Sequence, residues 1–392
     1  MLAGSDLDLR AGVSRREDGR LDSLTGLRAL AALLVVGTHA AFATGKLTHG
    51  YIGVVWARLE VGVSIFFALS GFLLFRPWVA AAADGTLAPS ARAYARRRLR
   101  RIMPAYVVTV LLAYGVYSFY STGPNPGQSV SGLIRHLTLT QIYTDNYLLT
   151  YLHRGLSQTW SLAVEVAFYA VLPLLAHLLL VVLCGDRWRP ARLLTGLAGL
   201  AAISPLWLLV LNTSDWLPNS AGMWLPAQLA PFAGGMAVAV LSVMGVRWRA
   251  GLLVPVAAIL YLVVSTPVAG AVTMGPVPLW EPLAKALLYA AIATLVVAAP
   301  TLGGRGMFDR LIASKPMVWL GEISYEIFLL HVLVMAVVLG AVLGWPLFTG
   351  SLPGLYLLTL GVTIPLAWLL NRLTSCKSPR SRRRTSPPPR CA

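Results

Sequence analysis

The stretch RLDSLTGLRALAALLVVGTHAAF, residues 20–42, decides how the rest of the chain has to fold. Its apolar part is long enough to cross a bilayer core as a single helix, which takes about 20 residues. It nevertheless contains Arg28 and His39. Ionisable side chains inside a membrane helix cost free energy and by default mark a functional site. The stretch therefore predicts a membrane protein whose first helix carries part of a site.

The same composition extends along the whole chain. Of its 392 residues, 57% are hydrophobic and 12% are charged, whereas soluble domains have about 25% charged residues. Apolar blocks long enough to span a membrane recur. We therefore expect an all-α integral membrane protein, a bundle of about ten transmembrane helices. The expected spans are 24–43, 61–80, 103–120, 160–183, 192–212, 223–244, 251–266, 279–299, 317–343 and 352–373.

Positive charges indicate the orientation of these spans. The net charge is +17, and most lysines and arginines lie in short connections and tails. With ten spans and a cytoplasmic N-terminus, the outer connections contain only Lys46, Arg58, Arg135 and Arg154, as the positive-inside rule requires. Both termini are thus expected in the cytoplasm and the protein in the inner or plasma membrane. A nucleic-acid partner is not expected, because it needs basic residues interleaved with aromatics on a soluble face.

The chain is expected to have three parts. Residues 1–22 and 375–392 have the composition of disordered tails, and residues 23–374 form the membrane domain. An alternative interpretation is that the first span is a cleaved signal peptide, since Ala41-Phe42-Ala43 resembles a cleavage site. The apolar run exceeds the usual signal length of about 7–15 residues, so a retained helix is favoured.

Arg28 and His39 share one face of the first helix. They are eleven positions apart, which at about 100° and 1.5 Å per residue places them within about 20° of each other and about 16 Å apart along the axis. Arg28 then lies near the cytoplasmic end and His39 in the outer half. The alternative is a snorkelling arginine beside a histidine that is bonded to a backbone carbonyl.

A second helix supplies a candidate partner for His39. Ser161, Glu165 and Tyr169 follow an i, i+4, i+8 pattern on one helix face. Glu165 is expected about 8–9 Å below the outer surface and His39 about 6 Å below it, so the two side chains can meet. A carboxylate beside an imidazole fixes its tautomer and raises its basicity, as a general base requires. The alternative is a protonated Glu165 bonded to a neighbouring helix.

For two further groups of polar residues, helix packing is an alternative to a role in the site. Ser324 and His331 are seven positions apart on one face, and such side chains often only join helices by hydrogen bonds. Ser70-Gly71 lies near the middle of the second span. It allows either close helix packing or a path for a thin ligand.

An arginine run, RRRLRR at residues 96–101, precedes the third span. Such runs usually set topology and contact anionic lipids, but arginine forks also suit phosphate groups. Arginines at the inner face and His and Glu deeper in the bilayer fit a phosphate-bearing donor on a long thin arm, such as a coenzyme A thioester. The three cysteines lack metal-ligand spacing, so no metal is expected. Lys285, four residues after Glu281, is expected to form an i, i+4 ion pair with it.

Five segments, taken together, resemble the membrane acyltransferase type 3 family. They keep the family's order in the chain over about residues 20–335: Arg28 with His39, FFALSGF at 66–72, RLRRIMP at 98–104, Trp160-Ser161 with Glu165 and Phe168-Tyr169, and Ser324-Tyr325 with His331. Phe328 and Glu326 depart from the family pattern. No segment after the last span resembles the soluble esterase-like domain that some members carry.

The resemblance implies an O-acyltransferase that uses acyl-CoA, for example acetyl-CoA, as donor co-substrate, with no permanently bound cofactor. The acceptor would be a hydroxyl of a sugar, a cell-envelope glycan or glycolipid, or a secondary metabolite. His39 is then catalytic with support from Glu165, and the other site residues bind substrates: Arg28, Ser70, Arg98, Arg101, Trp160, Ser161, Tyr169, Ser324, Tyr325 and His331. The alternative is a proton-coupled transporter of a glycolipid or small molecule, although the internal repeats typical of transporters are not evident.

Overall fold

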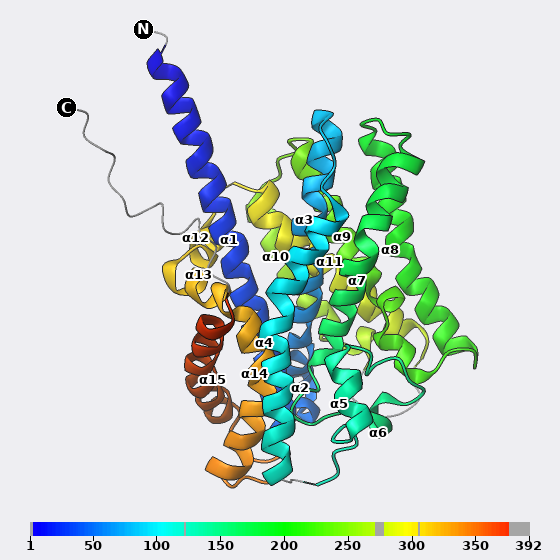
Figure 1. The fold of residues 1–392 in the computed structure, drawn as a ribbon, viewed down its shortest axis with the longest axis vertical. Coiled ribbons are helices and arrows are strands. Elements are labelled where there is room, and N and C mark those ends of the chain that lie inside the picture. The colour runs from blue at the N-terminus through cyan, green and yellow to red at the C-terminus, as the bar shows by residue number, and fades with distance from the viewer. Residues whose placement is uncertain (1–2, 121–122, 271–277, 305, 376–392) are drawn as a thin grey trace, which may run out of the picture.

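In the computed structural model the chain forms a bundle of helices (Figure 1). The structure describes residues 3–120, 123–270, 278–304 and 306–375, and no strand occurs among them. The all-α prediction is confirmed. The helices are α1 (Ala3–Ala43), α2 (Gly50–Ala57), α3 (Val61–Asp84), α4 (Ala91–Phe119), α5 (Val130–Leu137), α6 (Tyr147–Thr150), α7 (Thr159–His177), α8 (Pro190–Thr213), α9 (Leu229–Val243), α10 (Ala250–Val264), α11 (Trp280–Leu302), α12 (Met307–Ile312), α13 (Lys315–Glu322), α14 (Ser324–Val337) and α15 (Leu352–Thr374).

Nine helical segments in the described part of the chain are long and apolar enough to cross a membrane. The chain is therefore a multi-pass membrane protein. The expected span at 251–266 corresponds to α10, which has 15 residues. At 1.5 Å per residue α10 is about 22 Å long, shorter than a bilayer core of about 30 Å. Nine of the ten expected spans thus correspond to helical segments long enough to cross a membrane, and the seventh is a shorter helix that packs against α11.

The ninth expected span, 317–343, does not begin where the sequence predicts. The helix is interrupted at Ile323, so that α13 and α14 are separate helices. Gly321 lies against the backbone of Thr25 in α1, and the Ser324 hydroxyl donates a hydrogen bond to the Gly321 carbonyl at 2.8 Å. Glu322 is exposed at this break. The break thus leaves the membrane-crossing part, Ser324–Val342, without this exposed carboxylate.

The two ends of the described chain lie on the same side of the bundle. Figure 1 shows α1 starting and α15 ending toward the same end. α1 begins at Ala3 and therefore runs through the segment expected as a tail, and residues 376–392 lie outside the described residues. The division into two tails and a membrane domain, and the cytoplasmic position of the ends, stay predictions.

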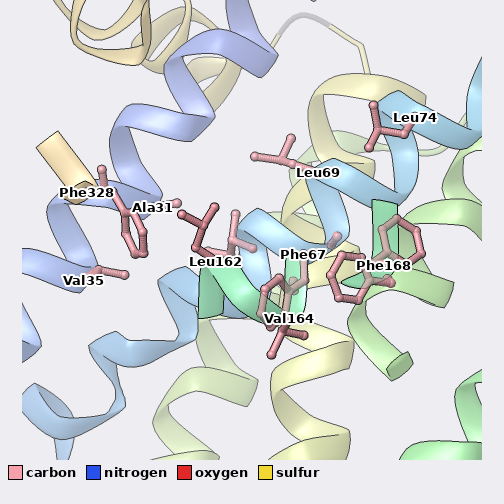
Figure 2. Packing of buried hydrophobic residues seen from close by; sticks show 14 of the residues in the cluster. Ala31, Val35, Phe67, Leu69, Leu74, Leu162, Val164, Phe168 and Phe328 are labelled. Atoms are coloured by element: carbon pink, nitrogen blue, oxygen red, sulfur yellow. The ribbon is translucent and has the colours of Figure 1, made fainter. Parts of the chain in front are cut away.

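The centre of the bundle is the close crossing of α3 and α9. Gly71 of α3 lies against the Phe232 carbonyl, and Gly235 of α9 lies against the Ala68 carbonyl. Phe168 of α7 stacks on Phe232 with ring centroids 4.0 Å apart, within the cluster that Figure 2 shows. Small residues at helix interfaces let two backbones approach in this way. Gly71 therefore allows the close packing of α3 against α9, whereas its neighbour Ser70 lines a cavity.

This crossing predicts a stability difference between two Gly→Ala variants. A methyl group at Gly71 would collide with the backbone of α9, and overpacking of this kind costs about 1–3 kcal/mol. Gly115 in α4 is exposed and has nothing near the added methyl, so the Ala substitution there is neutral or stabilising. We expect Gly71→Ala to lower the unfolding temperature of the detergent-solubilised protein and Gly115→Ala to leave it unchanged or raise it. An equal effect of both would contradict the close crossing.

Candidate active site

A cavity of about 820 Å³, partly open to solvent, lies among α1, α3, α4, α7 and α14. Both polar and apolar residues line it. The polar residues are Arg28, Ser70, Arg98, Arg101, Ser161, Glu165, Tyr169, Ser324 and Tyr325. The apolar residues are Val63, Phe66, Phe67, Leu69, Leu73, Leu74, Ile102, Leu162 and Phe328. Nine of the twelve site residues predicted from the sequence thus line one cavity.

Three arginines lie at the polar end of this cavity. Arg98 and Arg101 are three residues apart on α4 and so share one helix face. Arg98 is partly buried and Arg101 is exposed, and both line the cavity, whereas Arg96, Arg97 and Arg100 are exposed and do not line it. Arg28 joins them from α1. Glu165 is the single carboxylate in the lining, and the excess of positive charge makes this end suited to an anion.

Glu165 is held by two hydroxyl groups inside the cavity. Its carboxylate accepts hydrogen bonds from the Ser70 hydroxyl of α3 and the Tyr169 hydroxyl one turn along α7. The two hydroxyl oxygens are themselves 3.5 Å apart. Ser161, on the same face, donates a hydrogen bond to the Gln158 carbonyl at 3.1 Å. The face predicted from the i, i+4, i+8 spacing is therefore the one that lines the cavity.

The two histidines of the predicted site form a pair outside the cavity. The rings of His39 in α1 and His331 in α14 have centroids 5.1 Å apart. His331 is fully buried, and its Nδ1 lies 2.8 Å from the Phe328 carbonyl of the preceding turn. Nδ1 therefore carries the proton, which leaves Nε2 as the acceptor nitrogen. This Nε2 is buried without a hydrogen-bond partner in the part of the chain that the structure describes.

The structure brings Glu165 to Ser70 and Tyr169 rather than to His39. Within the described residues no hydrogen bond joins Glu165 to His39, and the carboxylate that acts electrostatically on His39 is Glu60. The depth estimate alone could not show this, because it fixes the height of a side chain along the membrane normal and not the helix that it faces. The expected orientation of His39 by Glu165 is thus replaced by the contact with His331.

Of the remaining predicted residues, Tyr325 and Ser324 lie in the cavity wall and Trp160 lies outside it. Tyr325 donates a hydrogen bond to the Ile102 carbonyl at 3.0 Å and so ties α14 to α4 at the cavity wall. Ser324 also lines the cavity, and its hydroxyl bonds to its own helix start. Trp160 is partly buried against the core and does not line the cavity. No group of three His, Cys, Asp or Glu that could hold a metal ion occurs in the described ranges.

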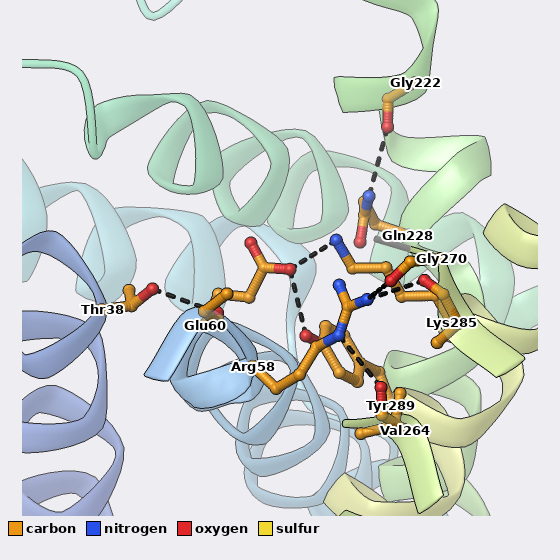
Figure 3. Close-up of polar contacts among 11 residues, drawn as sticks. Thr38, Arg58, Glu60, Gly222, Gln228, Val264, Gly270, Lys285 and Tyr289 are labelled. Atoms are coloured by element: carbon orange, nitrogen blue, oxygen red, sulfur yellow. Dashed lines mark hydrogen bonds and ion pairs between the residues drawn. The ribbon is translucent and has the colours of Figure 1, made fainter. Parts of the chain in front are cut away.

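A charged network near His39 was not anticipated from the sequence (Figure 3). Glu60 pairs with Lys285 and accepts a hydrogen bond from Tyr289 at 3.0 Å. The expected Lys285–Glu281 pair is therefore wrong, because Lys285 pairs with Glu60, just before the start of α3, instead of with the previous turn of α11. Arg58 donates to the carbonyls of Val264 and Ala269 at 3.0 and 2.8 Å. The signal in the sequence was two opposite charges, Arg58 and Glu60, at the start of an apolar run.

The connection between α4 and α7 contains two further buried histidines. His153 bonds through Nε2 to the Gln128 side chain at 2.6 Å, and His136 through Nδ1 to the Gly132 carbonyl at 2.8 Å. Burial lowers the pKa of His136 to about 4. Burial, followed by repulsion from His136, lowers the pKa of His153 to about 3. Both side chains are therefore neutral at pH 7 and pack this connection onto α4.

These lowered pKa values predict acid sensitivity. Unfolded histidines have a pKa of about 6.5, so between that pH and the folded pKa values the unfolded state binds more protons. The contribution of the two neutral histidines to the free energy of unfolding is therefore fully present above about pH 6.5. It falls as the pH drops, by about 1 kcal/mol per histidine at pH 5.5. We expect the unfolding temperature in detergent to fall between pH 7.5 and 5.5, and to fall less in His153→Gln. An equal fall in that variant would contradict the assignment.

Known acyltransferases are similar to this chain over most of its length. A family model described as an acyltransferase domain matches residues 21–372. The acyltransferase MdmB of Streptomyces mycarofaciens is 32% identical over 94% of this chain and 96% of its own length. The peptidoglycan O-acetyltransferase OatA of Listeria monocytogenes is 26% identical over 79% of this chain and 48% of its own length. No solved structure matches the chain significantly.

The family match covers the segments that build the cavity and the histidine pair. The resemblance of the five sequence segments is therefore confirmed over nearly the whole chain. The similarity to an acyltransferase domain and to an O-acetyltransferase supports a membrane O-acyltransferase. The chain belongs to the membrane acyltransferase type 3 family.

Proposed function

We propose that this protein transfers an acyl group from acyl-CoA to a hydroxyl of a sugar, a cell-envelope glycan or glycolipid, or a secondary metabolite. The observation that supports it best is the order of groups through the bundle. Arg28, Arg98 and Arg101 lie at one end of the cavity, the apolar wall follows, and the pair of His39 and His331 lies beyond it. A donor with anionic phosphates, a thin arm and a reactive thioester matches that order.

The arginines would bind the phosphate groups of the donor. Arginine presents a fork of N–H donors that matches phosphate oxygens, and it keeps its charge at any physiological pH. The Nε of Arg98 is buried without a hydrogen-bond partner among the residues described, so it has a free donor for such a ligand. Glu165, already bonded to Ser70 and Tyr169, limits the positive charge to the end of the cavity.

His39 would act as general base. It takes the proton of the acceptor hydroxyl while the oxygen attacks the thioester carbonyl. The tetrahedral intermediate then collapses and the carbon–sulfur bond breaks. The departing sulfur takes the proton from His39, so that CoA leaves as the free thiol. His331 is the positioning residue in this scheme, because its unpartnered Nε2 can accept an N–H from the neighbouring imidazole. A transient acyl-His39 is the variant, in which the imidazole nitrogen itself attacks the thioester and the hydroxyl then removes the acyl group.

The experiment that tests the function measures free CoA thiol. Purified protein in detergent or vesicles is mixed with acetyl-CoA, and glycan oligosaccharides or an envelope lipid extract are then added as acceptors. An acyltransferase releases thiol in proportion to the ester that mass spectrometry finds on the acceptor. A transporter would move its substrate without releasing thiol. Thiol release that no acceptor stimulates, together with unchanged envelope glycans and lipids in cells lacking the protein, would refute the proposal.

A further inference from the structure

The apolar end of the cavity is closed by two aromatic rings from different helices. Phe66 of α3 and Phe328 of α14 both line the cavity, and their ring centroids are 6.3 Å apart in an edge-to-face arrangement. Phe328 is 8% exposed. Figure 2 draws it against α1, near Ala31 and Val35, and α1 and α14 pack together. Such edge-to-face pairs are favourable beyond the area they bury, so the two rings form a packed wall.

The histidine pair lies on the other side of this wall. The Phe328 ring is 6.1 Å from the ring of His331, which in turn is 5.1 Å from His39. Neither histidine belongs to the lining of the cavity, whereas Phe328 does. Phe328 therefore separates the space that holds the arginines from the imidazoles. A group that enters the cavity at the arginines meets the two phenylalanines before it meets His39.

The long axis of the cavity follows one face of α3. The lining residues of that helix run from Val63 near its start to Leu74 in its middle. Eleven residues of helix correspond to about 16 Å. A donor whose phosphates lie at Arg98 and Arg101 can extend its arm along this face, so its thioester end arrives at Phe66 and Phe328.

We propose that Phe66 and Phe328 select the length of the acyl group and restrict the donor to short, unbranched acyl-CoA. This inference rests on the proposed function. A two-carbon acyl group adds little beyond the carbonyl that must reach the histidines. Each further methylene also has to pass between the two packed rings. In apolar pockets one methylene changes discrimination by about 10–200-fold. The wall thus admits an acetyl or similarly small group and disfavours a long chain.

The test compares the binding of acetyl-CoA and octanoyl-CoA to the purified full chain in detergent. The variants are Phe66→Ala and Phe328→Ala, with Phe66→Leu and Phe328→Leu as smaller changes where the alanine variants do not fold. Phe308→Leu is the control, since Phe308 packs against the core from α12 and does not line the cavity. Octanoyl-CoA also partitions into detergent, but it does so equally for every variant. The ratio of the two dissociation constants, octanoyl over acetyl, is therefore the quantity to compare.

We expect this ratio to be above one in the unaltered protein. It should fall by about 10-fold or more in the alanine variants and by a smaller factor in the leucine variants, and it should not change in Phe308→Leu. A ratio that stays constant in variants of both phenylalanines, while acetyl-CoA still binds, would overturn the inference and leave the proposed function intact. If the unaltered protein binds neither acetyl-CoA nor free CoA, the proposed function fails, and this inference fails with it.

Discussion

His39→Ala is expected to lower acyl transfer by about 10²–10⁴-fold, the usual contribution of a general base, while acyl-CoA still binds. Donor affinity is retained because the arginines that would hold the phosphates lie in the cavity, whereas His39 lies outside its lining. The measurement is the initial rate of thiol release with acceptor present, together with the dissociation constant of acetyl-CoA. A loss of rate with unchanged donor binding is the signature of a group that acts in the transition state.

The matched control for this variant is His177→Ala. His177 lies at the exposed end of α7 and does not line the cavity, so its loss should leave the rate within about twofold, as is usual for surface substitutions. Full transfer by His39→Ala would refute both the general-base scheme and the acyl-His39 variant. Mass spectrometry of the unaltered protein after mixing with acetyl-CoA alone separates these two, because only the second leaves an acetyl group on the chain.

The fold could be predicted from hydrophobicity because a bilayer sets the length of each crossing helix. That rule located nine spans. It failed at α10 and at the boundary between α13 and α14, which depend on contacts with other parts of the bundle and not on the length of an apolar run. α10 is apolar but short, and Arg58 donates a hydrogen bond to the Val264 carbonyl at its end. The boundary between α13 and α14 depends on Gly321 touching the backbone of α1. Neither contact is local in the sequence, so no window of residues could indicate it.

The site could be predicted to the level of helix faces. Spacing along α7 placed Ser161, Glu165 and Tyr169 together, and the cavity confirms that they share a wall. Which helices meet was the missing information. Glu165 faces Ser70 of α3, and His39 faces His331 of α14. Both contacts are set by the packing of the whole bundle, in which residues far apart in the chain become neighbours.

The double variant Arg98→Ala/Arg101→Ala is expected to raise the KM for acetyl-CoA by at least about 10-fold, since a hydrogen bond to a charged group contributes about 1.5–3 kcal/mol. The two side chains lie on the cavity face of α4, beside Arg28. The effect on kcat should be smaller, because phosphates bound at these arginines would lie far from the reacting carbonyl and would keep their contacts unchanged during the chemical step. Steady-state kinetics with varied acetyl-CoA at saturating acceptor measure both constants.

The same arginine run supplies the control, because Arg96→Ala/Arg100→Ala removes an equal charge from residues of α4 that do not line the cavity. If the run only sets topology or contacts anionic lipids, the two double variants should behave alike. If Arg98 and Arg101 bind the donor, only their removal raises KM, and the difference should persist in neutral detergent, where no anionic lipid is present. Equal KM values for the two double variants would refute phosphate binding. The comparison therefore separates a role in binding from a role in orientation using residues of the same type on one helix.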